Sequence, residues 1–327
     1  PARAQDVRCT DPGRGVIGTS PTGQPQGGDA CQKGVDLFNY LTPQLGSLIA
    51  GGNALVGRGA GLGGLGHFAV AVRANVLWSD IPDVSSAPTP TAGAPVSSRF
   101  ATVRRAVALP QIEAAMGLYA GLPLGLGRVG SVDALGSVFY LPDVSADHVD
   151  ITTSSAQLRF GYGVRVGILG ESAMLPSLSV SWMRRHLPTT SVVANPAAID
   201  TVRLTDFRNR ATAWRVVAGK GFGPLALSAG YGRDSYSSRA RVDFAIYDGC
   251  LAGLSCPVRP RAPFEYASGS SGSTVFADAV LTLPLLQLVA ELGQNRSSVK
   301  AGDLFNTFDQ PPDRARLFGA VAVRVSR

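Results

Sequence analysis

Few residues of this 327-residue chain have types and spacings that could do chemistry. Asp143, Asp147, His148 and Asp150 lie close together in sequence and could hold a calcium ion or another surface metal. Their spacing is not that of an ordered calcium-binding loop, so a solvated acidic loop is the favoured interpretation. No histidine accompanies a nucleophile motif such as G-x-S-x-G. We therefore predict that the chain is not an enzyme and uses no cofactor.

The glycines from Gly61 to Gly66 fit the pattern G-x-G-x-x-G. That pattern binds dinucleotide phosphates only where it follows a strand and begins a helix. Here a predicted helix precedes the glycines and a predicted strand follows them. We therefore interpret them as a flexible hinge and not as a phosphate site.

The net charge of +7 raises the question of nucleic acid as a partner. However, the arginines are scattered singly through apolar segments, whereas a nucleic-acid interface concentrates basic residues on one face. We predict no nucleic-acid partner.

Four cysteines form two sequence-local pairs, Cys9 with Cys31 and Cys250 with Cys256. This pattern predicts disulfides formed in an oxidising compartment. A metal site is the less favoured alternative, because the chain has no C-x-x-C motif. Small residues at Ala2 and Ala4 match a signal-peptidase site, so residues 1–4 are interpreted as a signal-peptide remnant, with an arbitrary alanine-rich start as the alternative.

The elements that position these residues change character along the chain. Residues 5–33 are rich in Gly, Pro, Asp and Gln, and the apolar residues of 35–56 recur at spacings of three and four. This predicts one or two short helices, broken near Pro43 and near Gly51. Residues 5–66 are therefore expected to form an irregular, disulfide-clipped N-terminal segment that plugs or caps the rest.

From His67 onward the period is two, most clearly in 156–170, where apolar residues alternate with polar residues or glycine. Such segments are separated by connections that alternate between short turns and long loops, as in outer-membrane barrels. The predicted strands are 67–80, 106–121, 129–141, 156–169, 176–188, 201–220, 225–246, 266–283, 285–297 and 314–326.

No stretch reaches the roughly 18 continuous apolar residues of a spanning helix, although 45% of the residues are hydrophobic. The other structure that pairs every backbone polar group within a bilayer is a closed barrel. We predict an all-β fold, a transmembrane antiparallel up-and-down β-barrel of about ten strands over residues 67–327. An even strand number places both termini on the short-turn, periplasmic side.

The apolar face of each predicted strand meets lipid, so the opposite face points into the lumen. Gly163→Ser, on the lumen face, is expected to be tolerated far better than Val164→Arg on the lipid face. The alternation places ten charged residues inward: Arg73, Glu113, Asp133, Arg159, Arg165, Arg215, Asp278, Glu291, Arg316 and Arg324. They could form a salt-bridge network that fills the barrel, or a constriction that selects anionic or zwitterionic solutes.

On these patterns the chain resembles bacterial outer-membrane β-barrels, and its helical, glycine-rich entry is similar to barrels of the fatty-acid-transporter type, which carry an N-terminal hatch. The resemblance implies an outer-membrane location, lipid as a partner, and a passive channel or transporter for a small solute with the N-terminal segment as plug. Two features depart from it: those transporters have more strands, and this chain ends Val325-Ser326-Arg327, without the terminal aromatic residue of many barrels. The alternative is a non-transporting structural or surface-interaction barrel with a lumen filled by salt bridges.

Overall fold

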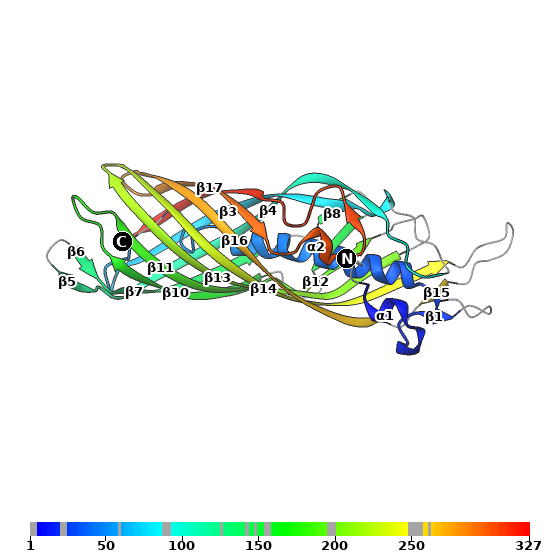
Figure 1. The fold of residues 1–327 in the computed structure, drawn as a ribbon. Helices are drawn as coiled ribbons and strands as arrows, with labels where there is room; N and C mark the ends of the chain where they lie inside the picture. Colours follow the sequence, from blue (N-terminus) through cyan, green and yellow to red (C-terminus); the bar gives the residue numbers. More distant parts are fainter. Residues whose placement is uncertain are drawn as a thin grey trace.

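The computed structural model describes residues 5–19, 25–57, 60–86, 93–124, 127–140, 144–146, 149–153, 158–194, 201–247, 258–260 and 263–327. Ten antiparallel strands pair in chain order, and the last pairs with the first, which closes the sheet into a ring (Figure 1). This confirms the predicted barrel and its strand number. The ring consists of β3 (Phe68–Asp83), β4 (Arg99–Tyr119), β7 (Ser131–Tyr140), β10 (Leu158–Leu169), β11 (Ser177–His186), β13 (Thr201–Phe222), β14 (Leu225–Tyr247), β16 (Phe264–Thr282), β17 (Gln287–Ser297) and β19 (Arg316–Ser326).

The remaining elements lie mostly at the two ends of the barrel. β5 (Leu122–Leu124) and β6 (Gly127–Val129) form a hairpin at the short-turn end. At the long-loop end, β12 (Thr190–Ala194), β9 (Val149–Thr153) and β8 (Val144–Ala146) extend the sheet outward from β13. The other short pieces are α1 (Val7–Thr10), η1 (Pro12–Arg14), β1 (Gly18–Thr19), β2 (Pro25–Gln26), η2 (Val84–Ser86), β15 (Val258–Pro260), η3 (Ala301–Asp303) and β18 (Thr307–Phe308).

The two faces of the wall differ in the way that a lipid-embedded barrel requires. On β10, Tyr162 and Val164 face outward and are 52% and 37% exposed, whereas Arg165 faces inward and is 2% exposed. The outward aromatic rings of Trp182 and Trp214 lie directly opposite each other on β11 and β13. A closed ring with an apolar outer face, aromatic residues on it, and short turns opposite long loops defines a transmembrane barrel of the outer-membrane type.

One inward position of β10 was interpreted wrongly from the sequence. A Cβ atom added at Gly163 would lie 2.3 Å from the backbone oxygen of Trp182 on β11. The neighbouring backbone leaves no room there, so the prediction that Gly163 tolerates a larger side chain is wrong.

The N-terminal segment contains one long helix, α2 (Gly28–Ala50, 23 residues), and not short broken helices. Pro43 lies inside it and lacks the N–H of a regular helix, which alone would cost about 3 kcal/mol. Burial offsets this cost, because every residue of α2 except Asn39, Leu41 and Leu45 is buried. The helix therefore continues through Pro43, because the surrounding barrel stabilises the helix. No helix among the described residues is long and apolar enough to cross a membrane.

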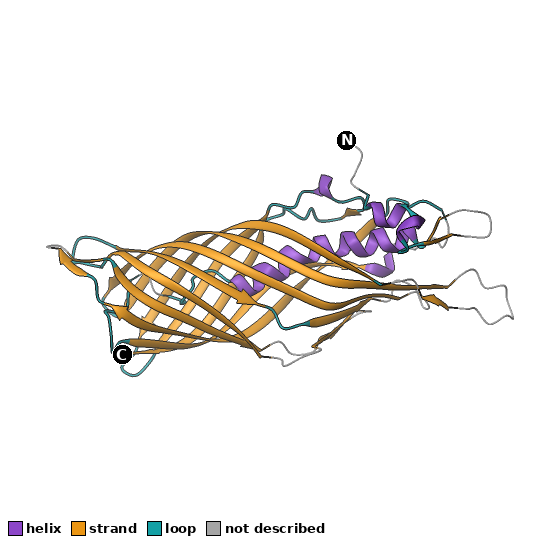
Figure 2. Ribbon diagram, turned by 90° about the horizontal axis from the view of Figure 1, so that it is seen from below, coloured by secondary structure: helices purple, strands orange, loops and turns teal. Residues whose placement is uncertain are grey.

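Helix α2 enters the barrel from the long-loop end and runs inward along the lumen (Figure 2). Residues 51–57 and 60–66 lie between α2 and the short-turn end, where the Phe68 amide donates to the Arg327 carbonyl oxygen over 3.0 Å. The residues before α2 remain at the long-loop end, where Arg8 donates to the Glu265 carbonyl oxygen of β16. The prediction that both termini lie at the same end is therefore wrong for the N-terminal residues. Ten strands do return the chain to one end, but the N-terminal segment crosses the lumen once more.

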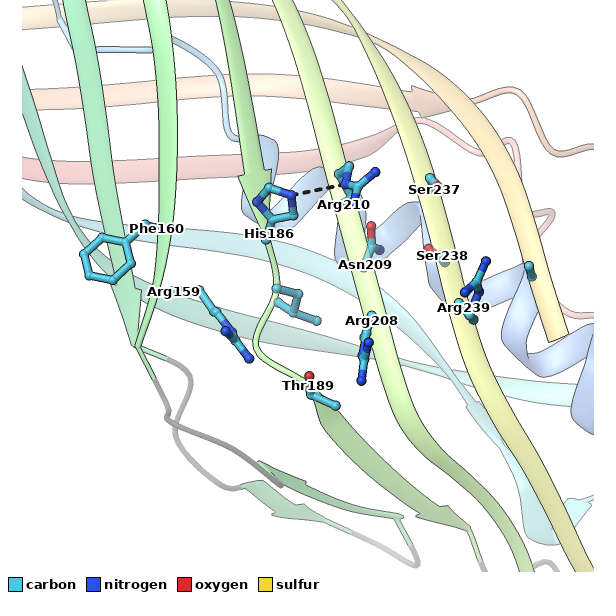
Figure 3. Close-up of a pocket in the computed structure, with 12 residues that line it drawn as sticks. Arg159, Phe160, His186, Thr189, Arg208, Asn209, Arg210, Ser237, Ser238 and Arg239 are labelled. Atoms are coloured by element: carbon cyan, nitrogen blue, oxygen red, sulfur yellow. Dashed lines mark hydrogen bonds between the residues drawn. The ribbon is translucent and has the colours of Figure 1, made fainter. Parts of the chain in front are cut away.

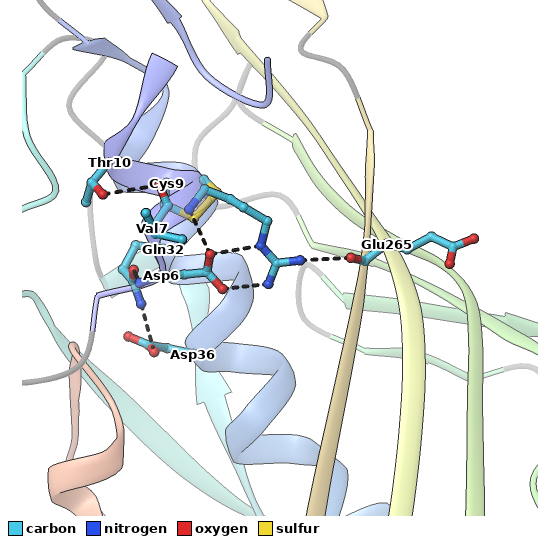
Figure 4. Close-up of a disulfide and its surroundings, with 9 residues drawn as sticks. Asp6, Val7, Cys9, Thr10, Gln32, Asp36 and Glu265 are labelled. Carbon is cyan, nitrogen blue, oxygen red and sulfur yellow. Dashed lines mark hydrogen bonds and ion pairs between the residues drawn. A yellow bond between two sulfur atoms is a disulfide. The ribbon is translucent and has the colours of Figure 1, made fainter. Parts of the chain in front are cut away.

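The predicted disulfide between Cys9 and Cys31 is present and joins α1 to the first turns of α2 (Figure 4). Beside it, Asp6 accepts hydrogen bonds from the Arg8 side chain, which also reaches β16. Cys250 and Cys256 lie outside the described residues, and their predicted bond stays a prediction.

Candidate functional site

The lumen of the barrel is occupied by the chain's own N-terminal segment. Nine of the ten residues predicted to face inward are at most 5% exposed: Arg73, Glu113, Asp133, Arg165, Arg215, Asp278, Glu291, Arg316 and Arg324. Arg159, near the loop end of β10, is partly buried and lines a separate cavity in the barrel wall. The nine buried charges are the candidate site, because eight of them contact the segment that fills the lumen and Arg165 pairs with one of these, Asp133.

At the centre of this site, one arginine joins carboxylates from two different strands. Arg73 on β3 donates to Glu113 on β4 over 3.0 Å and also pairs with Glu291 on β17. Arg185 on β11 approaches Glu113 within 3.5 Å. Arg73 and Glu113 lie on adjacent strands, whereas the pairs Arg73–Glu291 and Arg185–Glu113 bridge strands that are not neighbours in the ring, at the level where α2 ends.

The end of helix α2 is held by arginines. Arg215 donates to the carbonyl oxygens of Gly51 and Gly52, each over 2.7 Å, and Arg185 donates to that of Ala50. The last carbonyl groups of a helix lack helical partners and carry partial negative charge, so guanidinium groups stabilise them. The positive charge of Arg215 is in turn paired with Asp234 of β14 at 2.7 Å.

Carboxylates of the wall bind the backbone that follows. The Asn53 amide donates to Glu291 over 2.7 Å, and the Val56 amide donates to Glu113 over 3.1 Å. The Asn53 side chain also donates to Asp278 over 2.8 Å. Charge-assisted bonds of this kind are stronger than neutral ones, so the segment is fixed in a defined position.

The same arrangement continues to the short-turn end. Arg324 donates to the Val56 carbonyl oxygen over 2.6 Å, and Asp133 accepts from the Leu62 amide as well as from Arg165. The glycine tract fits closely against the wall, because a Cβ atom at Gly61 would lie 2.2 Å from Ser131 Oγ. The small residues therefore serve close packing inside the lumen.

At the loop end, Arg316 pairs with Asp80 at 3.3 Å and lies 5.7 Å from the ring centre of Tyr40 on α2. Asp36 on α2 accepts hydrogen bonds from the backbone and side chain of Asn306, in the connection between β17 and β19. An external loop is thereby attached to the plug.

Two members of the site were missed from the sequence. Arg185 was not among the residues predicted to face inward, although the inward alternation of Ser177, Ser179 and Ser181 along β11 extends to it. Asp234 lies in a polar stretch of β14, where no apolar alternation marks the two faces. The periodicity that located the other residues is weak at Asp234 but continues to Arg185.

The acidic cluster considered for metal binding is mostly outside the described residues, which include only Asp150, on β9. Within the described part of the chain, no group of His, Cys, Asp and Glu residues is arranged to hold a metal ion.

Comparisons with known proteins give structural similarity alone. No family model matches the chain, and no curated protein matches it. The translocator domain of the autotransporter NalP from Neisseria meningitidis is 10% identical, with 80% of this chain and 86% of that chain covered and a TM-score of 0.38. The outer-membrane protease OmpT from Escherichia coli is 10% identical, with 80% and 94% covered and a TM-score of 0.35.

The outer-membrane channel DcaP of Acinetobacter baumannii is 12% identical, with 82% of this chain and 100% of that chain covered and a TM-score of 0.19. These similar structures are outer-membrane proteins of different activities. The chain is an outer-membrane β-barrel on the features of its own fold, and the resemblance to fatty-acid transporters stays a prediction.

Proposed function

We propose that this barrel is a channel for a small solute that its own N-terminal segment holds closed. The observation that carries the proposal is the set of wall charges bonded to the backbone of residues 50–62. Charged groups that served only to fill the lumen could pair with one another and would not need to bind a plug. Here arginines and carboxylates from many strands bind the carbonyl and amide groups of one continuous segment.

Opening requires that residues 51–66 leave the lumen or rearrange within it. The wall then presents Arg73, Arg185 and Arg215 together with Glu113 and Glu291 to water. A constriction with both signs of charge favours anionic or zwitterionic small solutes over apolar ones. We therefore include this solute class in the proposal.

A reversible lock tests the proposal. Because the Cβ position of Gly61 would lie 3.1 Å from the Ser131 Cβ atom, a cysteine pair there, G61C with S131C, can form a disulfide with a small backbone adjustment. In planar bilayers we expect brief single-channel openings from the parent protein, loss of these openings in the oxidised variant, and their return on reduction. The parent protein under the same oxidising and reducing conditions is the control.

A parent protein that folds fully but never conducts, and that stays silent when the plug is loosened by Gly46→Val, would contradict the proposal. The second candidate is then a surface-interaction barrel. It is favoured by the position of residues 5–19 beside the long loops, where a partner outside the cell could reach them. Biotinylation of a cysteine placed at Arg14, which is exposed, in intact cells would test that position.

A further inference from the structure

A basic cavity lies in the barrel wall near the long-loop end. It has a volume of about 690 Å³ and is lined by residues of β10, β11, β13, β14 and β16 and of the segment after β11 (Figure 3). Among the described residues, the lining includes four arginines and one histidine and no carboxylate: Arg159, Phe160, His186, Leu187, Thr189, Arg208, Asn209, Arg210, Ser237, Ser238, Arg239 and Ala267.

Two of these arginines are placed against each other and not against acids. Arg208 on β13 and Arg239 on β14 are direct register partners, and both are exposed. On its other side, Arg239 lies opposite Ala267 of β16. Among the described residues, neither side chain has an ion-pair partner. Like charges directly opposite each other destabilise a sheet, and an anion between them would remove that cost.

The same two strands show the ordinary arrangement a few residues away. Arg203 lies opposite Asp243, and Arg241 lies opposite Glu265. Arginine is therefore balanced by a carboxylate at these positions and unbalanced in the cavity. The excess positive charge is local to the cavity.

Other polar groups in the cavity are arranged for a ligand. Arg210 donates its Nε hydrogen to His186 Nε2 over 3.1 Å, which fixes the guanidinium plane (Figure 3). On the same outward face, Ser237 of β14 lies directly opposite Arg210 of β13, and both are exposed. A hydroxyl beside several guanidinium groups matches a phosphate, which accepts several hydrogen bonds at once.

The height of the cavity indicates the source of the phosphate. Arg210 and Arg208 lie four and six residues beyond Trp214 along β13. At about 3.3 Å per residue and a tilt of about 45°, they are roughly 9–14 Å further toward the loop end than this aromatic residue. Aromatic rings mark the boundary between hydrocarbon and headgroups, so the arginines lie at the headgroup level of the outer leaflet. Phe160, 69% exposed beside them, offers an apolar contact for an acyl chain.

We propose that this cavity binds the phosphate group of an anionic lipid of the outer leaflet. The guanidinium groups of Arg208, Arg210 and Arg239 contact the phosphate, and Phe160 contacts the lipid chain. This site is independent of the proposed channel, because it lies on the outer side of the wall.

The test uses the folded full chain in a nonionic detergent, titrated with bis-phosphorylated lipid A. Replacing the like-charged pair in R208Q/R239Q should weaken binding by about tenfold or more, because charge-assisted hydrogen bonds are lost. The matched control is R203Q/R241Q, which removes the same charge from the same strands but from positions that face carboxylates. It should bind within about twofold of the parent. R208K/R239K retains the charge and should recover most of the binding.

Two further probes identify the ligand chemistry. The parent should bind dephosphorylated lipid A about tenfold more weakly or worse, and inorganic phosphate at about 10 mM should not displace the lipid. Equal binding of R208Q/R239Q and R203Q/R241Q would overturn the proposal, and so would equal binding of the dephosphorylated lipid. Displacement by inorganic phosphate would overturn the assignment to a lipid. Heat-modifiable migration of every variant on gels verifies that each has folded.

Discussion

At the scale of single residues, the barrel depends on buried charges that pair with opposite charges of the wall. Arg215 donates to the carbonyl oxygens of Gly51 and Gly52 at the C-terminal end of α2 and also pairs with Asp234. Its side chain is 1% exposed. Removing one partner of a buried pair leaves the other charge without compensation, which is more costly than the pair itself is stabilising.

We therefore expect Arg215→Met to lower the free energy of unfolding by about 3–5 kcal/mol, because Asp234 and two helix-end carbonyl groups lose their donor. Arg233→Met is the control, since Arg233 is exposed on the adjacent strand, and it should change this free energy by less than about 0.5 kcal/mol. Urea titrations in lipid vesicles measure both. A loss of similar size in the two variants would show that Arg215 does not hold the helix end.

A second residue-scale prediction concerns pH. Burial raises the pKa of Asp36 from its usual 3.8 to about 6, although hydrogen bonds from Asn306 partly oppose this shift. The folded protein therefore binds this proton more tightly than the unfolded chain. The resulting stabilisation is complete below about pH 4 and is lost as the pH rises through 6, with a slope of at most about 1.4 kcal/mol per pH unit.

Hydrogen exchange of α2 amides at pH values from 4 to 7.5, corrected for the intrinsic rate, measures this dependence. The parent should lose protection as the pH rises, and Asp36→Asn should remove that part of the dependence. An unchanged pH profile in Asp36→Asn would assign the effect to other groups.

At the scale of elements, the fit of α2 against the wall controls whether the lumen stays filled. Gly46 faces Tyr236 of β14, and a Cβ atom at Gly46 would lie 2.3 Å from that ring. Next to it, Ser47 donates to Asn295 of β17 over 2.7 Å. The helix therefore approaches the wall most closely near its inner end.

Gly46→Val should push this end of α2 from the wall and increase the frequency of single-channel openings at least several-fold. Gly34→Ala is the control on the same helix, because its Cβ atom would lie 3.3 Å from a movable Val242 methyl group. Planar-bilayer recordings of both variants measure the effect. Equal opening frequencies would mean that the fit at Gly46 does not gate the barrel.

At the scale of the whole molecule, the ring is stable only in a medium that covers its apolar exterior. Val164 faces outward in the middle of β10, opposite Ala134 and Trp182. Met174, 89% exposed in a short turn, lies beyond the wall.

Val164→Arg should lower the free energy of unfolding in vesicles by about 2–4 kcal/mol, because the charge would face lipid. Met174→Arg should leave this free energy within about 0.5 kcal/mol of that of the parent. Denaturant titrations with heat-modifiable migration as the folding signal compare the two. A Val164→Arg variant as stable as Met174→Arg would mean that this face of β10 does not meet lipid.

The barrel itself could be predicted from the sequence because its cause is local. Side chains of a strand alternate between two faces, so alternation along 156–170 assigns lipid and lumen without knowledge of the neighbours. The same alternation assigns the charged residues to the lumen. The number of alternating segments along the chain gives the number of strands.

What fills the lumen was decided only by the tertiary structure. Pro43 indicates a helix break when considered locally, yet the wall around α2 offsets its cost, and the direction of threading depends on contacts between residues far apart, such as Arg215 with Gly52 and Glu113 with Val56. Likewise, Gly163 appears permissive in sequence but lies against the backbone of the next strand. Alternation determines which face a residue occupies, whereas the groups that it meets there depend on long-range packing, which no local pattern encodes.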